Sequence, residues 1–153
     1  MDNFYNDLSY GKRGEKMFID AFTARGNKVI DMSDDWNYRA KDIDFKVITK
    51  SGRERTVEVK SDRASQTTGN FFIETFNSNN QSHNYNGWFY YCEADNICFV
   101  QQENHKAYIV RFEELKADIE NNTYKRANGY NAIGFLVPVS AIAQYQSCIE
   151  FAI

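Results

Sequence analysis

Two short segments joined by a glycine-ended turn constrain the fold of this chain more than any other feature. They span residues 41–47 and 56–62, and in each the apolar and polar side chains alternate as they do along a half-buried strand. Between them lies Lys50-Ser51-Gly52, and a three-residue hairpin loop commonly ends in a glycine with left-handed backbone. Such a loop pairs Thr49 with Arg53 and predicts an antiparallel hairpin.

The register of this hairpin decides which side chains share a face. Counting back from the loop gives five cross-strand pairs, which are Val47 with Arg55, Phe45 with Val57, Asp44 with Glu58, Ile43 with Val59 and Asp42 with Lys60. Opposed residues point to the same face, so one face is expected to be apolar and to carry Ile43, Phe45, Val57 and Val59. The other face then carries Asp44, Glu58 and Lys60. A two-residue loop would shift the register and mix the faces, so the turn and the hydrophobic pattern agree.

The polar residues of that second face predict a metal site beside a phosphate. Two opposed carboxylates repel each other, whereas Mg²⁺ prefers oxygen ligands and is usually held by one or two carboxylates plus substrate phosphate. We therefore predict that Asp44, Glu58 and the carbonyl of Val59 bind Mg²⁺, with Mn²⁺ as a substitute. Lys60 would position the attacking water or stabilise the charge that grows on the phosphate. A solvated strand face with a Glu-x-Lys repeat is the structural alternative.

This arrangement resembles the PD-(D/E)xK nuclease superfamily. Its members carry an aspartate on one strand and (Asp/Glu)-x-Lys on the next, which correspond here to Asp44 and Glu58-Val59-Lys60. The proline of the family name is absent and Ile43 stands in its place, which is a frequent departure. Many members also have a glutamate on the preceding helix, and Glu15 takes that place in a helix predicted over residues 9–24.

A longer stretch narrows the resemblance to one branch. Residues 58–62, followed by Thr68-Gly69-Asn70-Phe71-Phe72-Ile73-Glu74, look like a phage-type branch related to Holliday junction resolvases. The resemblance implies an α/β fold with a restriction-endonuclease-like core, in which a central mixed β-sheet is flanked by helices. It also implies a Mg²⁺-dependent endodeoxyribonuclease, including junction-selective cleavage, with the catalytic residues Glu15, Asp44, Glu58 and Lys60. Glu74 is a further candidate helper on the neighbouring strand.

Other functions stay open because a fold does not fix its activity. One alternative is a catalytically silent protein on the same fold that binds nucleic acid or a host factor, and another is an RNA nuclease. Intact Asp44, Glu58 and Lys60 argue against loss of activity. The net charge of −3 and the ten tyrosines are compatible with the alternative of a protein that binds a host factor.

The distribution of charge predicts where DNA is contacted. Residues 1–65 hold 13 Lys and Arg against 12 Asp and Glu, whereas the remainder holds 5 against 9. Phosphate contacts are therefore expected from the first part of the chain, at Lys12, Arg13, Lys16, Arg63 and the nearby Asn70. One hairpin holds the chemistry to cut one DNA strand, so cutting both strands predicts a homodimer. The acidic part of the chain from Trp88 onward is the expected subunit contact.

Length and cysteine content set the broad class. A chain of 153 residues predicts one domain over 1–153. It shows no signal sequence and no apolar run long enough to span a bilayer, so a cytoplasmic protein without membrane contact is expected. Three cysteines make no paired framework, and His83 and His105 fit no zinc pattern.

Local patterns predict the remaining elements. We expect strands at 28–32, 71–75, 87–91, 97–101 and 135–138, a helix at 112–121 and a short helix capped by Ser140. Residues 33–39 and 77–86 are expected to be loops. The aromatic run Trp88-Phe89-Tyr90-Tyr91 is interpreted as a strand that contributes mainly to the core.

Overall fold

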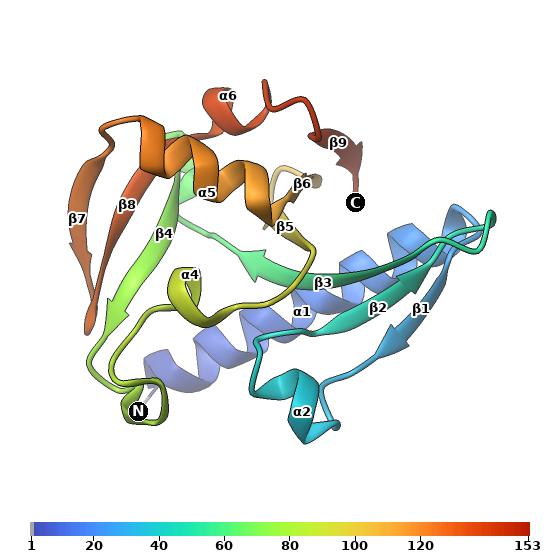
Figure 1. The fold of residues 1–153 in the computed structure, drawn as a ribbon, viewed down its shortest axis with the longest axis horizontal. Coiled ribbons are helices and arrows are strands. Elements are labelled where there is room, and N and C mark those ends of the chain that lie inside the picture. The colour runs from blue at the N-terminus through green and yellow to red at the C-terminus, as the bar shows by residue number, and fades with distance from the viewer. Residues whose placement is uncertain (1) are drawn as a thin grey trace.

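The computed structural model describes residues 2–153, with side chains from Tyr5 onward. The elements in chain order are α1 (Asp2–Ala24), β1 (Lys28–Asp31), α2 (Trp36–Arg39), β2 (Phe45–Ile48), β3 (Glu54–Ser61), α3 (Ser65–Thr68), β4 (Asn70–Asn77), the 3-10 helix η1 (Gln81–His83), α4 (Trp88–Tyr91), β5 (Asn96–Gln101), β6 (Lys106–Arg111), α5 (Phe112–Asn121), β7 (Lys125–Gly129), β8 (Ala132–Pro138), α6 (Val139–Ile142) and β9 (Ile149–Ala152). Figure 1 shows their arrangement.

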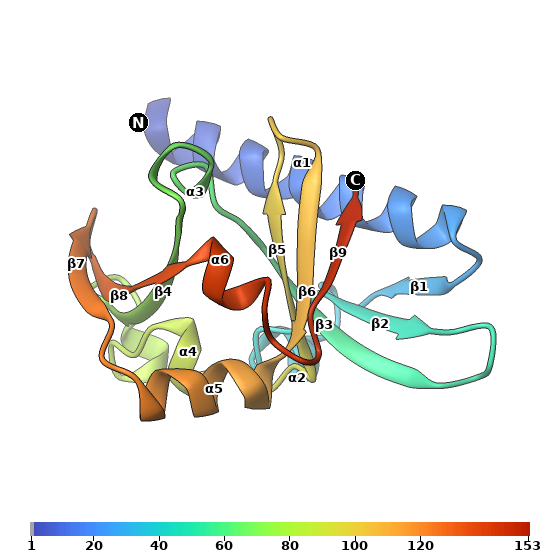
Figure 2. The ribbon, with the colours of Figure 1, turned by 90° about the horizontal axis from the view of Figure 1, so that it is seen from above.

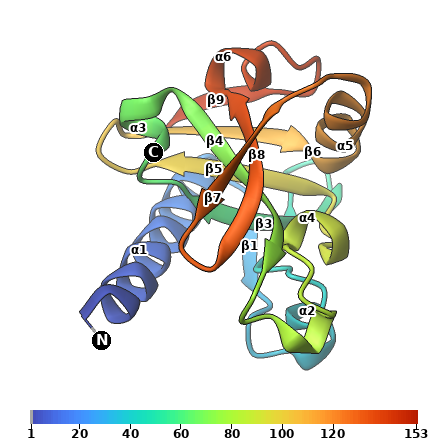
Figure 3. The same ribbon diagram turned by 90° about the vertical axis from the view of Figure 1, so that its left-hand side faces the viewer.

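The strands form two sheets. The larger sheet has the order β1-β2-β3-β5-β6-β9, in which β3 and β5 run parallel and the other neighbours antiparallel. The smaller sheet, β4-β8-β7, is antiparallel and faces the viewer in Figure 3. A parallel pair needs a crossover, and here the crossover from β3 to β5 contains α3, β4 and α4. The predicted α/β fold, with a central mixed sheet flanked by helices, is therefore confirmed.

Two apolar clusters lie on opposite faces of the larger sheet. On one face α1 packs through Phe18 against Phe45, with ring centroids 5.3 Å apart. On the other face α4, α5 and the smaller sheet bury a second cluster that includes Phe71 and Phe99. The N-terminal half of α1 lies on the same side of the molecule as the smaller sheet (Figures 1 and 2). Among residues 2–153, no helix has both the length and the apolar character needed to cross a membrane.

The predicted hairpin register is confirmed along β2 and β3. Phe45 is paired with Val57, and Val47 with Arg55. The loop has the predicted form, because Gly52 has a left-handed φ of 81° and its N–H donates to the Thr49 carbonyl at 2.9 Å.

The same register prediction is wrong before β2. The chain leaves β3 at Asp44, whose carbonyl accepts a hydrogen bond from Met32 N–H at 2.8 Å instead. None of the predicted strand pairs before Phe45 forms, which are Asp44 with Glu58, Ile43 with Val59 and Asp42 with Lys60. Ile43 packs in the cluster with Phe71, on the opposite face of the sheet from the other three apolar residues.

Other predicted elements divide into confirmed and corrected ones. The ends of α1 and α5 and the strands β1, β4, β5 and β8 fall where predicted, but α1 begins at Asp2 rather than Ser9, and Ser140 lies inside α6. The predicted loop 33–39 contains α2. Strands β6, β7 and β9 were not predicted.

The predicted strand at 87–91 is wrong, because Trp88–Tyr91 forms the short helix α4. A four-residue apolar run has too few residues for its periodicity to separate strand from helix. Gly87 sets the position of this helix, since a Cβ there would lie 2.3 Å from the Glu74 carbonyl oxygen on β4. Trp88 and Phe89 are buried as predicted, while Tyr90 is 57 % exposed.

Candidate active site

The structure brings Asp44, Glu58 and Lys60 together at the middle of β3. Asp44 Oδ2 accepts a hydrogen bond from Val59 N–H at 2.9 Å. The carboxylate thus takes the place of the backbone carbonyl that would accept this hydrogen bond in a continuous pair of strands. Glu58 Oε1 lies 2.7 Å from Lys60 Nζ. Val57 and Val59 face α1, so strand alternation turns Glu58 and Lys60 to the opposite face. The side chains that the hairpin pattern grouped are thus close in space.

Asp42 joins this group and was not predicted as a site residue. Its Oδ2 atom lies 2.8 Å from Lys60 Nζ, so two carboxylates hold the ammonium. Asp42 adopts a left-handed backbone with φ of 54°, which is uncommon for a residue other than glycine. The signal in the sequence was its position two residues before Asp44, opposite Lys60 in the predicted register.

Burial dominates the ionisation of the two predicted metal ligands. It raises the pKa of Asp44 to about 6, and the nearby charge of Glu15 adds to this effect, while Lys60 opposes it. Burial also raises the pKa of Glu58 well above its usual range, since this residue is only 4 % exposed. Glu58 Oε2 is buried and has no hydrogen-bond partner. An unpartnered buried acceptor is costly, and a cation beside it would remove that cost.

Lys60 is held as a cation. Burial favours its neutral form, but the charges of Glu58 and Asp42 outweigh burial and raise the Lys60 pKa well above its usual value. The ammonium also lies 5.1 Å from the ring centroid of Trp88, which favours the charged form.

The donor set suits a hard divalent cation. Asp44 and Glu58 supply carboxylate oxygens, and oxygen ligands are those that Mg²⁺ prefers. Among the side chains that the structure describes, from Tyr5 to Ile153, however, no three or more His, Cys, Asp and Glu are grouped as a metal cage. A cation here would take its remaining ligands from backbone, water or substrate oxygens, and the Val59 carbonyl stays a predicted ligand.

Two further glutamates lie near this group. Glu15 on α1 is coupled electrostatically to Asp44, although its carboxylate also pairs with Lys12 at 2.9 Å. Glu74 on β4 has a pKa raised by burial, and the charge of Lys60 opposes that rise. The pairing of β4 shifts between Glu74 and Phe76, and such bulges re-aim side chains.

An open cleft of about 560 Å³ leads to Lys60. Its lining comes from α1, β3, β4, α4, β5 and the hairpin of β7 and β8. It includes Lys60, Asp62, Arg63 and Glu74 together with the aromatic residues Tyr10, Phe72, Trp88, Tyr91, Phe99 and Tyr130. Arg63 lies over the Tyr10 ring, 4.3 Å from its centroid. The cleft therefore opens Lys60 to solvent, while Asp44 and Glu58 lie behind it and are not part of the lining.

The predicted DNA contacts are distributed unevenly around the cleft. Arg63 lines it, and Lys12 interacts electrostatically with Asp44. Arg13 donates to Gln102 Oε1, Lys16 pairs with Asp20 at 2.8 Å, and Asn70 donates to the Thr68 carbonyl at 3.0 Å. Of the five, Arg63 lines the cleft and Lys12 is electrostatically coupled to Asp44, although each also has a carboxylate partner, Asp7 at 3.9 Å and Glu15 at 2.9 Å.

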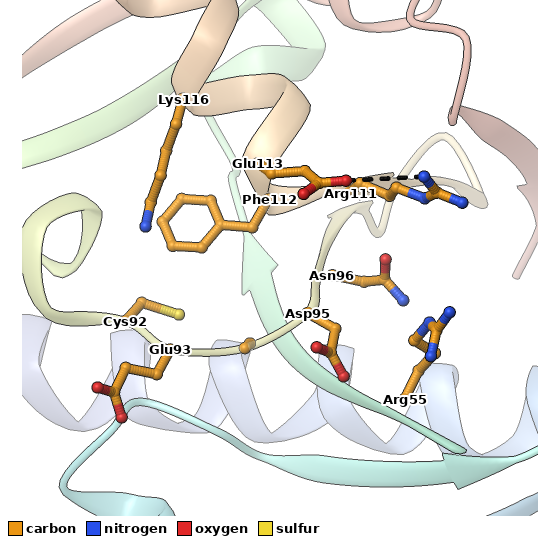
Figure 4. A pocket seen from close by; sticks show the side chains of 10 residues that line it. Arg55, Cys92, Glu93, Asp95, Asn96, Arg111, Phe112, Glu113 and Lys116 are labelled. Carbon is orange, nitrogen blue, oxygen red and sulfur yellow. Dashed lines mark ion pairs between the residues drawn. The ribbon is translucent and has the colours of Figure 1, made fainter. Parts of the chain in front are cut away.

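A second pocket of about 530 Å³ lies between α5 and the strands β3, β5 and β6 (Figure 4). Its charges are largely paired within the protein. Arg111 lies 3.6 Å from Glu113, and Asp95 accepts a hydrogen bond from Thr56 N–H at 2.8 Å. Lys60, which contacts Glu58 and Asp42, lines the first cleft and not this pocket, so the first cleft is the candidate site.

Comparison with known proteins bears on the fold. No protein-family model matches the chain, and no curated protein matches it. Among solved structures, the chain is similar to a bacterial homing endonuclease. That protein, I-Ssp6803I, superposes with a TM-score of 0.51 over 86 % of this chain and 78 % of its own, at 15 % sequence identity. At this identity the likeness concerns the fold, and it agrees with the mixed sheet and flanking helices described above.

Proposed function

We propose that this protein is a metal-dependent DNA endonuclease that hydrolyses phosphodiester bonds. The observation that carries the proposal is the convergence of Asp44, Glu58 and Lys60 beside an open cleft, with Glu58 Oε2 buried and unpartnered. The similarity in fold to a homing endonuclease supports it. So does the PD-(D/E)xK resemblance, which rests on the same three residues.

Each residue of the group has a distinct role in this proposal. Asp44 and Glu58 would hold Mg²⁺, which when bound polarises the phosphodiester and makes a bound water more acidic. Lys60, kept charged by Glu58 and Asp42, stabilises the charge that grows on the phosphate or orients the attacking water. Arg63 and Lys12 neutralise neighbouring phosphates and fix the register of the strand. Water adds to phosphorus, the ester P–O bond breaks, and the leaving oxygen takes up a proton.

Cleavage assays on several DNA forms test the function directly. The protein is incubated with linear duplex, supercoiled circular and four-way-junction DNA, and with RNA of matching sequence, in Mg²⁺, in Mn²⁺ and in EDTA. We expect DNA cleavage with either metal and none in EDTA. Absence of cleavage on every DNA would overturn the proposal, and binding without cleavage would favour a catalytically silent nucleic-acid-binding protein on this fold.

We propose further that two copies act together on duplex DNA. One chain offers one Asp44–Glu58–Lys60 group, and cutting both strands needs two such groups related by a two-fold axis. The edge strand β9, with Ile149 62 % exposed, belongs to the acidic part of the chain expected to form the contact. Light scattering at micromolar concentration is expected to give the mass of a dimer, and a nicking assay to show paired cuts. A strict monomer that only nicks contradicts this arrangement.

A further inference from the structure

The candidate cleft carries more aromatic surface than contact with phosphates requires. Phosphate oxygens are bound by cationic and N–H or O–H donors, whereas aromatic faces bind nucleobases by stacking. Trp88, Phe99 and Tyr10 are buried residues of its lining, and Phe72, Tyr91 and Tyr130 add further rings. The lining therefore suits a base as well as a phosphate.

Tyr130 is the most solvent-accessible of these rings. It is 95 % exposed and stands in the two-residue turn between β7 and β8, where Gly129 is paired with Ala132. The turn is held in place, because the carbonyl of Asn131 accepts a hydrogen bond from Ser78 N–H at 2.9 Å. The ring buries almost no area in the protein and contributes little to folding, but its backbone position at the cleft is fixed.

The opposite side of the cleft offers a complementary charge. Arg63, which follows β3 and lines the cleft, stacks on the Tyr10 ring of α1 at 4.3 Å, and Arg13 lies 5.3 Å from the same ring centroid. Tyr10 is anchored by donating its hydroxyl hydrogen to Glu103 at 2.9 Å. A nucleotide presents both an anion and a ring, so its phosphate fits the Arg63 side and its base fits Tyr130.

We propose that Tyr130 forms a stacking subsite for an unpaired base of the DNA strand held in the cleft. The inference rests on the proposed nuclease function and names the kind of strand that this site prefers. In continuous duplex each base is already stacked on its neighbours, and taking one out costs free energy, least where the base is unpaired. The subsite therefore favours strands with an unpaired nucleotide next to the phosphate at Lys60 over continuous duplex.

Binding measurements in EDTA test the subsite without relying on cleavage. The probes are a fluorescent single-stranded oligonucleotide, its continuous duplex, and the same duplex with one unpaired nucleotide. Tyr130→Ala should weaken binding of the single-stranded and unpaired probes about 10- to 100-fold, in line with the usual loss for a stacked base. The variant should therefore bind these probes no more tightly than it binds the continuous duplex. Tyr130→Trp should keep that advantage, and its fluorescence should be quenched on binding.

Tyr90→Ala is the matched control. Tyr90 is 57 % exposed on α4 and does not line the cleft, so its loss should change none of the three affinities. The subsite is refuted if Tyr130→Ala acts like Tyr90→Ala, if it weakens all three probes equally, or if the wild-type protein binds none of them. A protein that shows the Tyr130-dependent preference but never cuts DNA would instead refute the nuclease function and leave the subsite standing.

Discussion

Replacing Lys60 with alanine is expected to lower DNA cleavage about 10²- to 10⁴-fold, the usual contribution of a positioned catalytic side chain. The Lys60 ammonium lies within 2.8 Å of both Asp42 and Glu58, so it is fixed and charged before substrate arrives. Such a group acts on the charge that develops in the transition state, and its loss should affect the rate more than the binding of DNA. Single-turnover rates at saturating Mg²⁺, with DNA affinity measured in EDTA, separate the two effects.

The variant needs a test of folding and two control variants, because Lys60 also neutralises a buried carboxylate. Removing one partner of a buried ion pair typically costs roughly 3–5 kcal/mol of stability, so circular dichroism must show that the variant is folded. Lys60→Gln keeps a hydrogen-bond donor near Glu58 and serves if the alanine variant does not fold. Lys41→Ala removes an exposed lysine paired with Glu93 at 3.2 Å and should leave the rate unchanged. Near wild-type cleavage by both Lys60 variants would show that the site is misassigned.

The part of the site built from local pairing could be predicted from the sequence. A glycine-ended loop and strict alternation fix one register for β2 and β3, and that register turns Glu58 and Lys60 to the same face. Both signals lie within a segment of the chain where a one-residue slip would expose Phe45 and Val57.

The part that depends on tertiary contacts could not be predicted. The Asp44 side chain accepts a hydrogen bond from Val59 N–H, and the Asp44 carbonyl accepts one from Met32 N–H. The strand pairing therefore ends before Asp42, which contacts Lys60 through its side chain instead. No local sequence pattern indicates that the Asp44 side chain, rather than a backbone carbonyl, accepts the hydrogen bond from Val59 N–H.

The surroundings of the site also come from distant segments. Glu74 reaches the cleft because β4 is bulged and pairs with β8, some 60 residues later in the chain. Trp88 reaches Lys60 because its run folds as a helix, held against β4 by the close approach at Gly87. The aromatic pattern alone favoured a strand, and packing against the smaller sheet decided otherwise.

Asp44→Asn should weaken binding of Mn²⁺ at least tenfold and at the same time stabilise the metal-free protein. Even outer partners of metal ligands cost about 10- to 100-fold in affinity when removed, so a direct carboxylate ligand should cost no less. Asparagine can still accept the hydrogen bond from Val59 N–H, so the strand contact is kept. The substitution removes the buried negative charge of Asp44 beside Glu58. Calorimetric titration and thermal unfolding measure the two effects.

The raised pKa of Asp44 fixes the sign and the pH range of the stability effect. The folded protein keeps a proton on Asp44 up to about pH 6, whereas the unfolded chain loses it near the usual value of 3.8. The stability of the metal-free protein therefore falls as pH rises from about 4 to about 6 and stays lower above that. Asp44→Asn removes this loss, and at pH 7 the gain should be about 1–3 kcal/mol, or several degrees in Tm. The affinity for Mn²⁺, which needs the ionised carboxylate, should change in the opposite direction and decrease below pH 6.

Glu74→Gln is the matched control for both measurements. Its pKa is also raised by burial, so it should gain some stability, but its expected loss of metal affinity is much smaller because Asp44 and Glu58 are the proposed ligands. Equal losses of affinity in the two variants would remove Asp44 from the primary ligand set. A lower Tm for metal-free Asp44→Asn at pH 7 would show that the buried charge does not destabilise the empty site. The combination of weaker metal binding and higher stability is expected of a carboxylate kept for a cation, since a purely structural aspartate would lose stability when neutralised.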